Sequence, residues 1–317
     1  MKRAKLTGLV LTLLVLFGAH DAFALTISPV RVEITGNPGQ TLRGEMEILN
    51  EQQEQKTFFS SFENFEPSGD TGSPRFVGDT GNLSKWLKTT DRIDIASNER
   101  QIVPFTITIP ADAEPGGYFS AIFWGSQDPK DQLAGEVAIG GKLGVLILLR
   151  VAGDIHEEAG LSEFSTVDGK KILTAVPVAL SYRFTNKGGD RVVPLGDIVI
   201  KNTLGMKVDT LKANESEGNV LPNSSRKFQL VWEKDAPKDM IGFLANAKAQ
   251  FSNFHFGFYR AQAEIVWGSE NKIEKSSTWF FLLPWQALTI VVVVLMVLVF
   301  GVKRYNVWIV SRSSTGK

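Results

Sequence analysis

The stretch that indicates the fold class is residues 102–110, which read IVPFTITIP. Val103, Phe105, Ile107 and Ile109 are apolar, and threonines stand between the last three of them. Alternation with a period of two is typical of a strand that buries one face. Similar strand patterns lie on both sides, in residues 25–34, 42–49, 58–62, 93–95, 118–124 and 143–151. Short strands at this spacing predict an all-β sandwich.

A second β-rich unit follows a polar segment bounded by glycines, residues 154–160, which we expect to be a hinge. Further strand patterns lie in residues 171–184, 197–201, 207–211, 227–232 and 259–267, and a short helix is expected near 239–250. The length of the region suggests two domains. The sequence therefore predicts two consecutive β-sandwich domains, 25–153 and 161–275.

The N-terminus has the order of parts that a secretory signal peptide needs. Lys2, Arg3 and Lys5 precede an apolar stretch over residues 6–18, and Ala22-Phe23-Ala24 supplies an A-x-A cleavage site. The alternative is an uncleaved anchor, but an apolar stretch of about 13 residues is short against the roughly 20 that a spanning helix needs. We expect residues 1–24 to be removed.

The other end of the chain predicts a membrane anchor. Residues 280–302 carry no charge, and as a helix they would reach about 34 Å, enough for a hydrocarbon core of about 30 Å. A helix tolerates proline in its first turn, so an alternative start of the helix proper is Pro284, with residues 279–283 in the interface. Lys303 and Arg304 follow at once, so the tail 303–317 is expected in the cytoplasm. A buried core helix is the alternative, but no polar face interrupts the run. The prediction is a single-pass protein of the cell membrane with extracytoplasmic N-terminal domains.

Composition excludes several classes of function. The chain has no cysteine, which removes disulfides, thiolate metal sites and cysteine nucleophiles. Lys and Arg number 34, as do Asp and Glu, and this balance argues against nucleic acid as a partner.

No catalytic constellation is evident in the sequence. After the signal peptide, His156 and His255 are the remaining histidines, and neither has a metal-ligand spacing. A G-x-S-x-G nucleophile elbow is also missing. We therefore expect no enzyme activity, no cofactor, no metal and no catalytic residue.

The triplet Asp-Thr-Gly occurs twice, at Asp70 and at Asp79. Aspartic proteases use two such triplets, but on separate lobes, whereas these are close together in a stretch rich in glycine, serine and proline. Turn chemistry explains them, since Asp and Gly favour tight turns. Whether the Asp70/Asp79 loop binds calcium stays open at this level.

Aromatic side chains are the remaining candidates for a binding surface. Residues 114–125 place Tyr118, Phe119, Phe123 and Trp124 in one strand, so about half should face outward and could bind a partner. The alternative is that packing covers both faces. A second aromatic cluster lies in residues 251–259, with the same two interpretations.

The chain resembles a known family in its short motifs and its layout. Residues 25–32 (LTISPVRV), 102–110 and 112–118 (DAEPGGY) are similar to the Ig-like domain of periplasmic pilus chaperones and, more closely, to the WxL-interacting surface proteins, whose domain is also labelled DUF916. The resemblance implies two Ig-like sandwiches. Arg31 falls where the chaperones keep a basic residue in the first strand, and it joins the candidate partner-binding residues.

The resemblance also implies a function. In the WxL-interacting family the first domain is implicated in binding peptidoglycan and the second in holding a surface protein. We expect a non-enzymatic, membrane-anchored binding or scaffolding protein that recognises wall polymer or another surface protein. An assembly chaperone for surface or pilus-type subunits is the alternative, which an exposed edge strand beside a groove would favour. A cleft with convergent ionisable side chains would favour an enzyme.

Overall fold

The computed structural model describes residues 25–128, 141–236 and 241–313. The predicted signal peptide 1–24 and the last four residues of the predicted tail lie outside this part of the chain. The chain divides into two compact units, Met1–Glu66 with Arg75–Ile155, and Pro67–Pro74 with His156–Lys317. The main division falls between Ile155 and His156, inside the segment expected to be a hinge.

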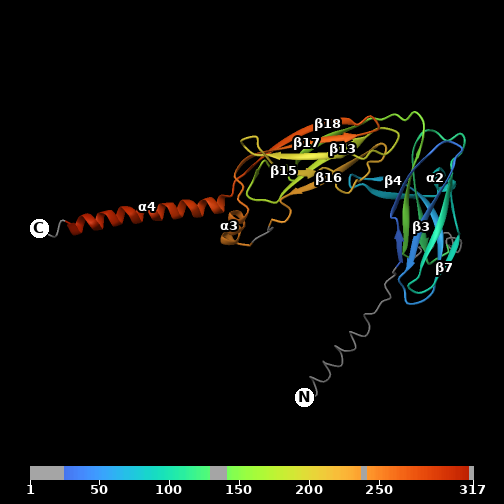
Figure 1. Ribbon diagram of the computed structural model, residues 1–317, viewed down its shortest axis with the longest axis horizontal. Coiled ribbons are helices and arrows are strands. Elements are labelled where there is room, and N and C mark those ends of the chain that lie inside the picture. The colour runs from blue at the N-terminus through green and yellow to red at the C-terminus, as the bar shows by residue number, and fades with distance from the viewer. Residues whose placement is uncertain (1–24, 129–140, 237–240, 314–317) are drawn as a thin grey trace, which may run out of the picture. The chain divides into compact units, whose positions relative to one another are not determined.

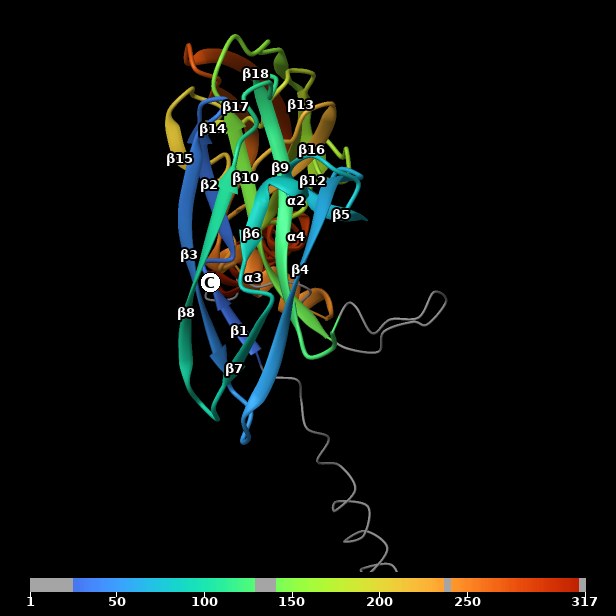
Figure 2. The ribbon, with the colours of Figure 1, turned by 90° about the vertical axis from the view of Figure 1, so that its right-hand side faces the viewer.

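The first unit is a sandwich of two sheets (Figure 2). One sheet has the order β1-β3-β8-β6, and the other has the order β2-β10-β9-β4-β5, with β7 also paired to β4. A short helix, α2 (Leu83–Trp86), precedes β6. The strands are β1 (Leu25–Ser28), β2 (Arg31–Gly36), β3 (Thr41–Asn50), β4 (Lys56–Ser68), β5 (Ser73–Gly78), β6 (Leu87–Thr89), β7 (Arg92–Ile95), β8 (Arg100–Thr108), β9 (Gly116–Gly125) and β10 (Lys142–Val151).

The second unit is also a sandwich of two sheets (Figure 1). Its sheets have the orders β11-β13-β16 and β12-β18-β17-β14-β15. The strands are β11 (Ala159–Thr166), β12 (Ile172–Leu173), β13 (Val178–Asn186), β14 (Leu195–Lys201), β15 (Lys207–Lys212), β16 (Ser224–Trp232), β17 (Gly257–Trp267) and β18 (Lys272–Leu282). The predicted short helix is α3 (Phe243–Ser252).

Each sandwich buries its own apolar core. In β8 the alternating residues Val103, Phe105 and Ile107 are all buried, as their period of two predicts. The second core is built around large rings, among them Tyr182 and Trp232, which are fully buried. The predicted fold class is confirmed: the chain is mostly β, with two consecutive Ig-like β-sandwiches and a C-terminal apolar helix.

Each sandwich has two sides along which the edges of its sheets meet. Three of these four sides have one feature in common. On each of them, strands next to each other in sequence lie at the edges of opposite sheets, and a short connection joins them: β1 to β2, β6 to β7, and β11 to β12. The first of these crossings occurs at Pro29. On the fourth side the edge strands β15 and β16 are joined by the longer segment 213–223.

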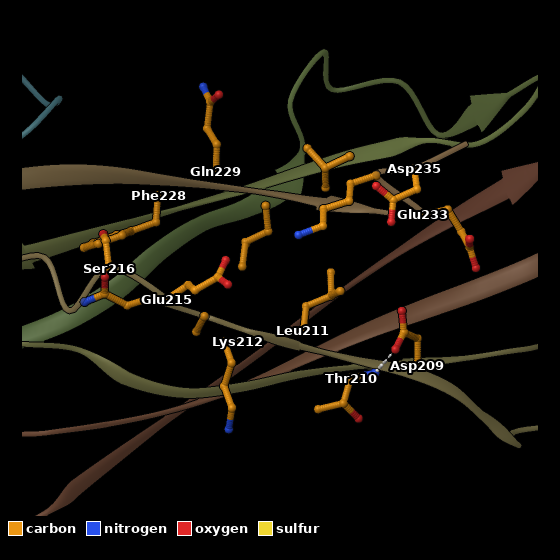
Figure 3. Close-up of a pocket in the computed structure, with 15 residues that line it drawn as sticks. Asp209, Thr210, Leu211, Lys212, Glu215, Ser216, Phe228, Gln229, Glu233 and Asp235 are labelled. Atoms are coloured by element: carbon orange, nitrogen blue, oxygen red, sulfur yellow. Dashed lines mark hydrogen bonds between the residues drawn. The ribbon is translucent and has the colours of Figure 1, made fainter. Parts of the chain in front are cut away.

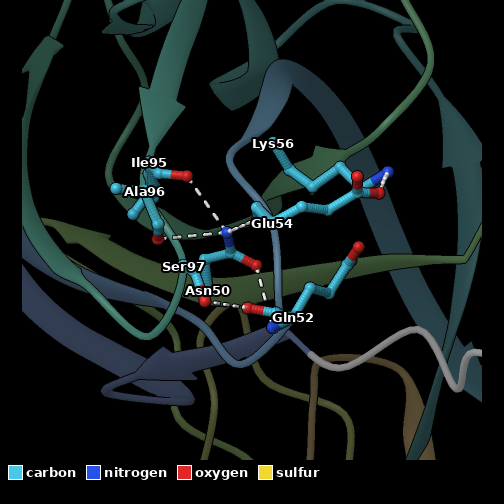
Figure 4. Close-up of polar contacts among 7 residues, drawn as sticks. All are labelled: Asn50, Gln52, Glu54, Lys56, Ile95, Ala96 and Ser97. Atoms are coloured by element: carbon cyan, nitrogen blue, oxygen red, sulfur yellow. Dashed lines mark hydrogen bonds and ion pairs between the residues drawn. The ribbon is translucent and has the colours of Figure 1, made fainter.

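Both units use a buried asparagine at the end of a strand. In Figure 4 the Asn50 side-chain amide, at the end of β3, donates to the carbonyls of Glu54, Ile95 and Ala96 at 2.9, 3.0 and 3.1 Å. Its oxygen accepts from the backbone N–H of Gln52 at 3.1 Å. The side chain therefore ties the turn after β3 to the segment after β7.

Asn186 makes the same set of contacts at the end of β13. Its amide donates to the carbonyls of Asp190 and Val220 at 2.7 and 2.9 Å, and its oxygen accepts from the N–H of Gly188 at 2.9 Å. In both cases the oxygen binds the residue two positions on, and the amide binds the one four positions on. We call these two sites the asparagine clamps.

The C-terminal helix α4 (Trp285–Ser313) contains one candidate membrane span, Trp285–Ile309. It begins beside Pro284, the alternative start, and not at residue 280, because Phe280 and Leu282 are fully buried inward-facing residues of β18. The polar stretch 269–277 before it belongs to the β17–β18 hairpin.

Candidate functional site

The aromatic strand that the sequence singled out is β9, in the middle of its sheet. Tyr118 and Trp124 face the core of the first sandwich. Trp124 is fully buried, and its indole N–H points to the sulfur of Met46 at 3.3 Å. Tyr118 packs against Trp86, with ring centroids 4.6 Å apart. Trp124 thus acts as a core residue and offers no surface to a partner.

Phe119 and Phe123 lie on the opposite, outer face of β9, where other rings cover them. Phe65 packs against Phe119 at 5.9 Å between centroids, and Phe76 packs edge-on against Phe123 at 4.8 Å. The Lys142 ammonium lies 4.5 Å from the Phe123 ring centre. Phe123 is therefore only 7% exposed, whereas Phe76 is 38% exposed.

Arg31 lies on this outer face too, in the edge strand β2. It is in register with Leu146 of β10, which is in register with Ala121 of β9. Its guanidinium is 3.0 Å from the Glu33 carboxylate and about a third exposed. The structure therefore brings Arg31, Phe119 and Phe123 to one face and sends Tyr118 and Trp124 to the other.

In the Asp70/Asp79 loop, both carboxylates contact other side chains, and Asp70 lies 3.1 Å from the Arg183 guanidinium. Asp79 accepts a hydrogen bond from the Ser84 hydroxyl at 2.7 Å. No group of three or more His, Cys, Asp or Glu side chains among the described residues could hold a metal ion.

A groove that the sequence did not reveal lies on the fourth side of the sandwiches, between β15 and β16 (Figure 3). It has a volume of about 830 Å³. Side chains and backbone from both edge strands and from the turns after them line it. The lining residues are Asp209, Thr210, Leu211, Lys212, Ala213, Asn214, Glu215, Ser216, Phe228, Gln229, Leu230, Val231, Glu233, Lys234 and Asp235.

The floor of the groove is the flank of the second core. Leu211 from β15 and Leu230 from β16 are partly buried and pack against that core. Phe228 stacks on Tyr182, with centroids 5.0 Å apart and planes 15° from parallel. Apolar side chains from both sheets thus meet the solvent here.

A hydrogen bond fixes the end of β15 to the opposite sheet. The hydroxyl of Tyr182 in β13 donates to the Ala213 carbonyl at 3.0 Å. Burial raises the pKa of Tyr182, so this hydroxyl stays protonated and can donate. The next turn is closed by Asn214, whose side chain binds both the N–H and the carbonyl of Gly218, at 2.8 and 3.0 Å. These contacts fix the position of the segment that follows β15 at the end of the groove.

The rim is charged, with acids in excess. Carboxylates come from Asp209, Glu215, Glu233 and Asp235, and ammonium groups from Lys212 and Lys234. Lys212 is paired with Asp197 at 2.8 Å. At one end, the Glu233 carboxylate is 3.7 Å from the His255 ring, and burial lowers the pKa of His255 more than Glu233 raises it.

The backbone N–H and C=O groups of β15 and β16 also belong to this site. In the described residues, β15 pairs with β14 and β16 pairs with β13. Every second residue of an antiparallel edge strand directs its N–H and C=O away from the sheet. Two of these donors are already used: the Lys227 N–H donates to the Asp70 carbonyl, and the Thr210 N–H donates to the Asp209 carboxylate, each at 2.7 Å. The other outward-facing backbone groups of the two strands border the groove. The lining residues that the structure describes include no histidine or cysteine.

Comparisons with known proteins give structural likeness and no sequence family. No protein-family model matches the chain, and no curated protein matches it. The class 5 fimbriae chaperone CfaA is 12% identical and aligns over 82% of this chain and 100% of its own, with a TM-score of 0.38.

Two further solved structures are of the same kind. The E. coli chaperone DraB is 12% identical over 82% of this chain and 95% of its own, with a TM-score of 0.36. A match to the Salmonella enterica SafA pilin in complex with the SafB chaperone is 8% identical over 83% of this chain and 99% of the matched one, with a TM-score of 0.38. At these TM-scores the likeness transfers no property to this chain, and the WxL-interacting resemblance stays a prediction.

Proposed function

We propose that this chain is a non-enzymatic, membrane-anchored protein of the cell envelope that holds an extended segment of a partner surface protein in the β15–β16 groove. The observation that supports this proposal is the combination of two sheet edges, open apart from the N–H groups of Lys227 and Thr210, with an apolar floor between them. An incoming strand would pair with the backbone of β15 or β16 and direct alternate side chains toward Leu211 and Leu230.

The dimensions of the groove suit a short strand. β15 spans Lys207–Lys212, which corresponds to about 20 Å of extended chain at roughly 3.4 Å per residue. About three side chains of a paired segment would then face the floor. The acidic side chains of Asp209, Glu233 and Asp235 favour a partner segment that carries basic residues beside its apolar ones.

Such a groove fits a chaperone-like role better than a polymer-binding one. A surface subunit with an unpaired strand would be protected from aggregation while its strand is paired. Peptidoglycan binding would instead need an exposed surface, and the aromatic residues proposed for it include Phe123 and Trp124, which are buried. We therefore place the chaperone-like role first and wall-polymer binding second.

Crosslinking from inside the groove tests the proposal. The chain has no cysteine, so one introduced cysteine is a unique attachment point for a photo-crosslinker. Glu215→Cys lies in the turn after β15, where Figure 3 shows its side chain directed into the groove, and Glu264→Cys, an equally exposed glutamate on β17, lies outside it. In membranes of the source cells, we expect the first variant to crosslink one envelope protein through an extended segment and the second not to.

A parallel sedimentation assay with purified peptidoglycan separates the two roles. If the full chain binds this polymer saturably and Glu215→Cys crosslinks no more than Glu264→Cys, the groove is not the binding site and the wall-polymer role takes its place.

A further inference from the structure

One end of the second sandwich exposes an unusual number of large apolar side chains. On the outer face of β17 and β18, Phe258 packs against Phe281 with centroids 4.7 Å apart and against Trp279 at 6.1 Å. Phe256 joins them, 5.7 Å from Phe281. We call Phe256, Phe258, Trp279 and Phe281 the aromatic collar. Phe258 is 53% exposed, although it belongs to a regular strand.

Two other segments extend this apolar end. The turn between β14 and β15 is fixed to the collar by Thr203, whose hydroxyl binds both the N–H and the carbonyl of Phe258, at 3.0 and 3.1 Å. That turn exposes Leu204 (79%) and Met206. Helix α3 exposes Leu244 (73%) and Phe251.

Both the collar and α3 lie at the start of the membrane helix. β18, which carries Trp279 and Phe281, ends at Leu282, and α4 begins at Trp285. In Figure 1, α3 lies beside the start of α4. Gln250 of α3 bonds to Gln286 and accepts from the backbone N–H of Ala287 at 3.0 Å.

Side-chain character changes with distance from α4 along one face of the sheet. Phe258 and Phe281 are opposite each other near the helix. The next pair on this face, farther from α4, is Arg260 with Trp279. Two pairs beyond it, Glu264 is opposite Lys275. The Lys171 ammonium lies 5.6 Å from the centre of the Trp279 ring. Each step along this face is about 7 Å. Apolar rings followed by basic and then mixed charge is the order of side chains that a bilayer boundary selects.

We infer that this end of the second sandwich is a lipid-binding surface: the aromatic collar, the Leu204 turn and α3 insert into the boundary region of the bilayer that α4 crosses. The inference depends on α4 spanning the membrane and is independent of the β15–β16 groove. The ligand is the lipid bilayer because the collar adjoins the membrane helix in the chain. A helix that enters the bilayer at Trp285 holds these side chains at the surface of the bilayer. Lys171 and Arg260 would lie at the level of the lipid phosphates.

Single nitroxide labels measure depth directly in this cysteine-free chain. The full chain is reconstituted in phosphatidylcholine–phosphatidylglycerol vesicles with a label at Phe258→Cys, Leu204→Cys or Leu244→Cys. Glu270→Cys is the control, in the turn at the other end of the same hairpin. We expect the ratio of oxygen to nickel-chelate accessibility to be several-fold higher at the first three positions than at 270.

The use of three positions protects the test against misfolding. Leu204 and Leu244 are largely exposed, so their replacement removes little packing even if Phe258→Cys disturbs the sheet. Ratios at 204 and 244 that equal the ratio at 270 would overturn the inference. Low accessibility to both reagents would also overturn it, since that result means that protein covers the surface.

Discussion

In the first sandwich the chain passes between the edges of opposite sheets twice over short connections, at β1–β2 and at β6–β7. In the second it does so once, at β11–β12, and on the other side residues 213–223 separate β15 from β16. The two units otherwise share their architecture, including an asparagine clamp at equivalent points. The groove lies on the one side of the two sandwiches where the connection between the edge strands is long. A short crossover holds the two edges together, whereas a long one lets them separate.

The largest expected effect comes from removing a clamp. Asn50→Ala leaves the carbonyls of Ile95 and Ala96 without this donor in a buried site, and should lower the free energy of unfolding of the first unit by about 2 to 3 kcal/mol. Asn186→Ala should do the same to the second unit. Hydrogen exchange measured by mass spectrometry in increasing denaturant assigns each loss to its unit.

If the clamps serve only their own sandwich, each substitution leaves the exchange of the other unit unchanged. Equal acceleration in both units after either substitution would show that the sandwiches unfold together, and the comparison between them would lose its basis.

A smaller difference is expected between the two fully buried tryptophans, Trp124 and Trp232. The N–H of Trp124 points to Met46 sulfur, whereas the N–H of Trp232 is buried without a hydrogen-bond partner among the described residues. Trp→Phe leaves a cavity in both cores but at position 232 also removes an unsatisfied donor. We expect Trp124→Phe to cost about 1 kcal/mol more than Trp232→Phe in denaturant unfolding. A larger loss at 232 would contradict this reasoning.

The smallest effect concerns pH and only the second unit. Burial lowers the pKa of His255 in the folded chain, so the unfolded chain, with an ordinary value of about 6.5, binds the proton more readily. The stability of the second unit should therefore fall as the pH drops below about 6.5 and level off below the folded pKa. His255→Asn should reduce this slope. An unchanged slope would mean that other groups cause it.

The local pattern of the sequence predicted the strands but not their neighbours. Residues 207–211 and 227–232 were both expected to be strands, and they match β15 and β16 closely. That both are edges depends on sheet order, which pairs β14 with β17 and β13 with β11 across long separations. The groove could not be predicted for this reason.

Two other differences have similar causes. The alternation in β9 showed that half of its rings face outward, but Phe65 and Phe76, which cover Phe119 and Phe123, come from other strands. Before the membrane helix, residues 280–302 are uncharged throughout. The sequence pattern therefore does not show where the buried strand ends and the membrane span begins, since both are apolar. Phe280 and Leu282 were therefore assigned to the helix, although they are in β18.

The claim that the open side of the second sandwich pairs with a partner strand can be measured at the backbone. Hydrogen exchange of the full chain in lipid nanodiscs should be compared with and without the crosslinked envelope protein, once purified. We expect slower exchange in β15 and β16 and unchanged exchange in β6 and β7, the corresponding edges of the first sandwich. Complex formation with unchanged exchange in β15 and β16, or with protection of β6 and β7 instead, would contradict the account.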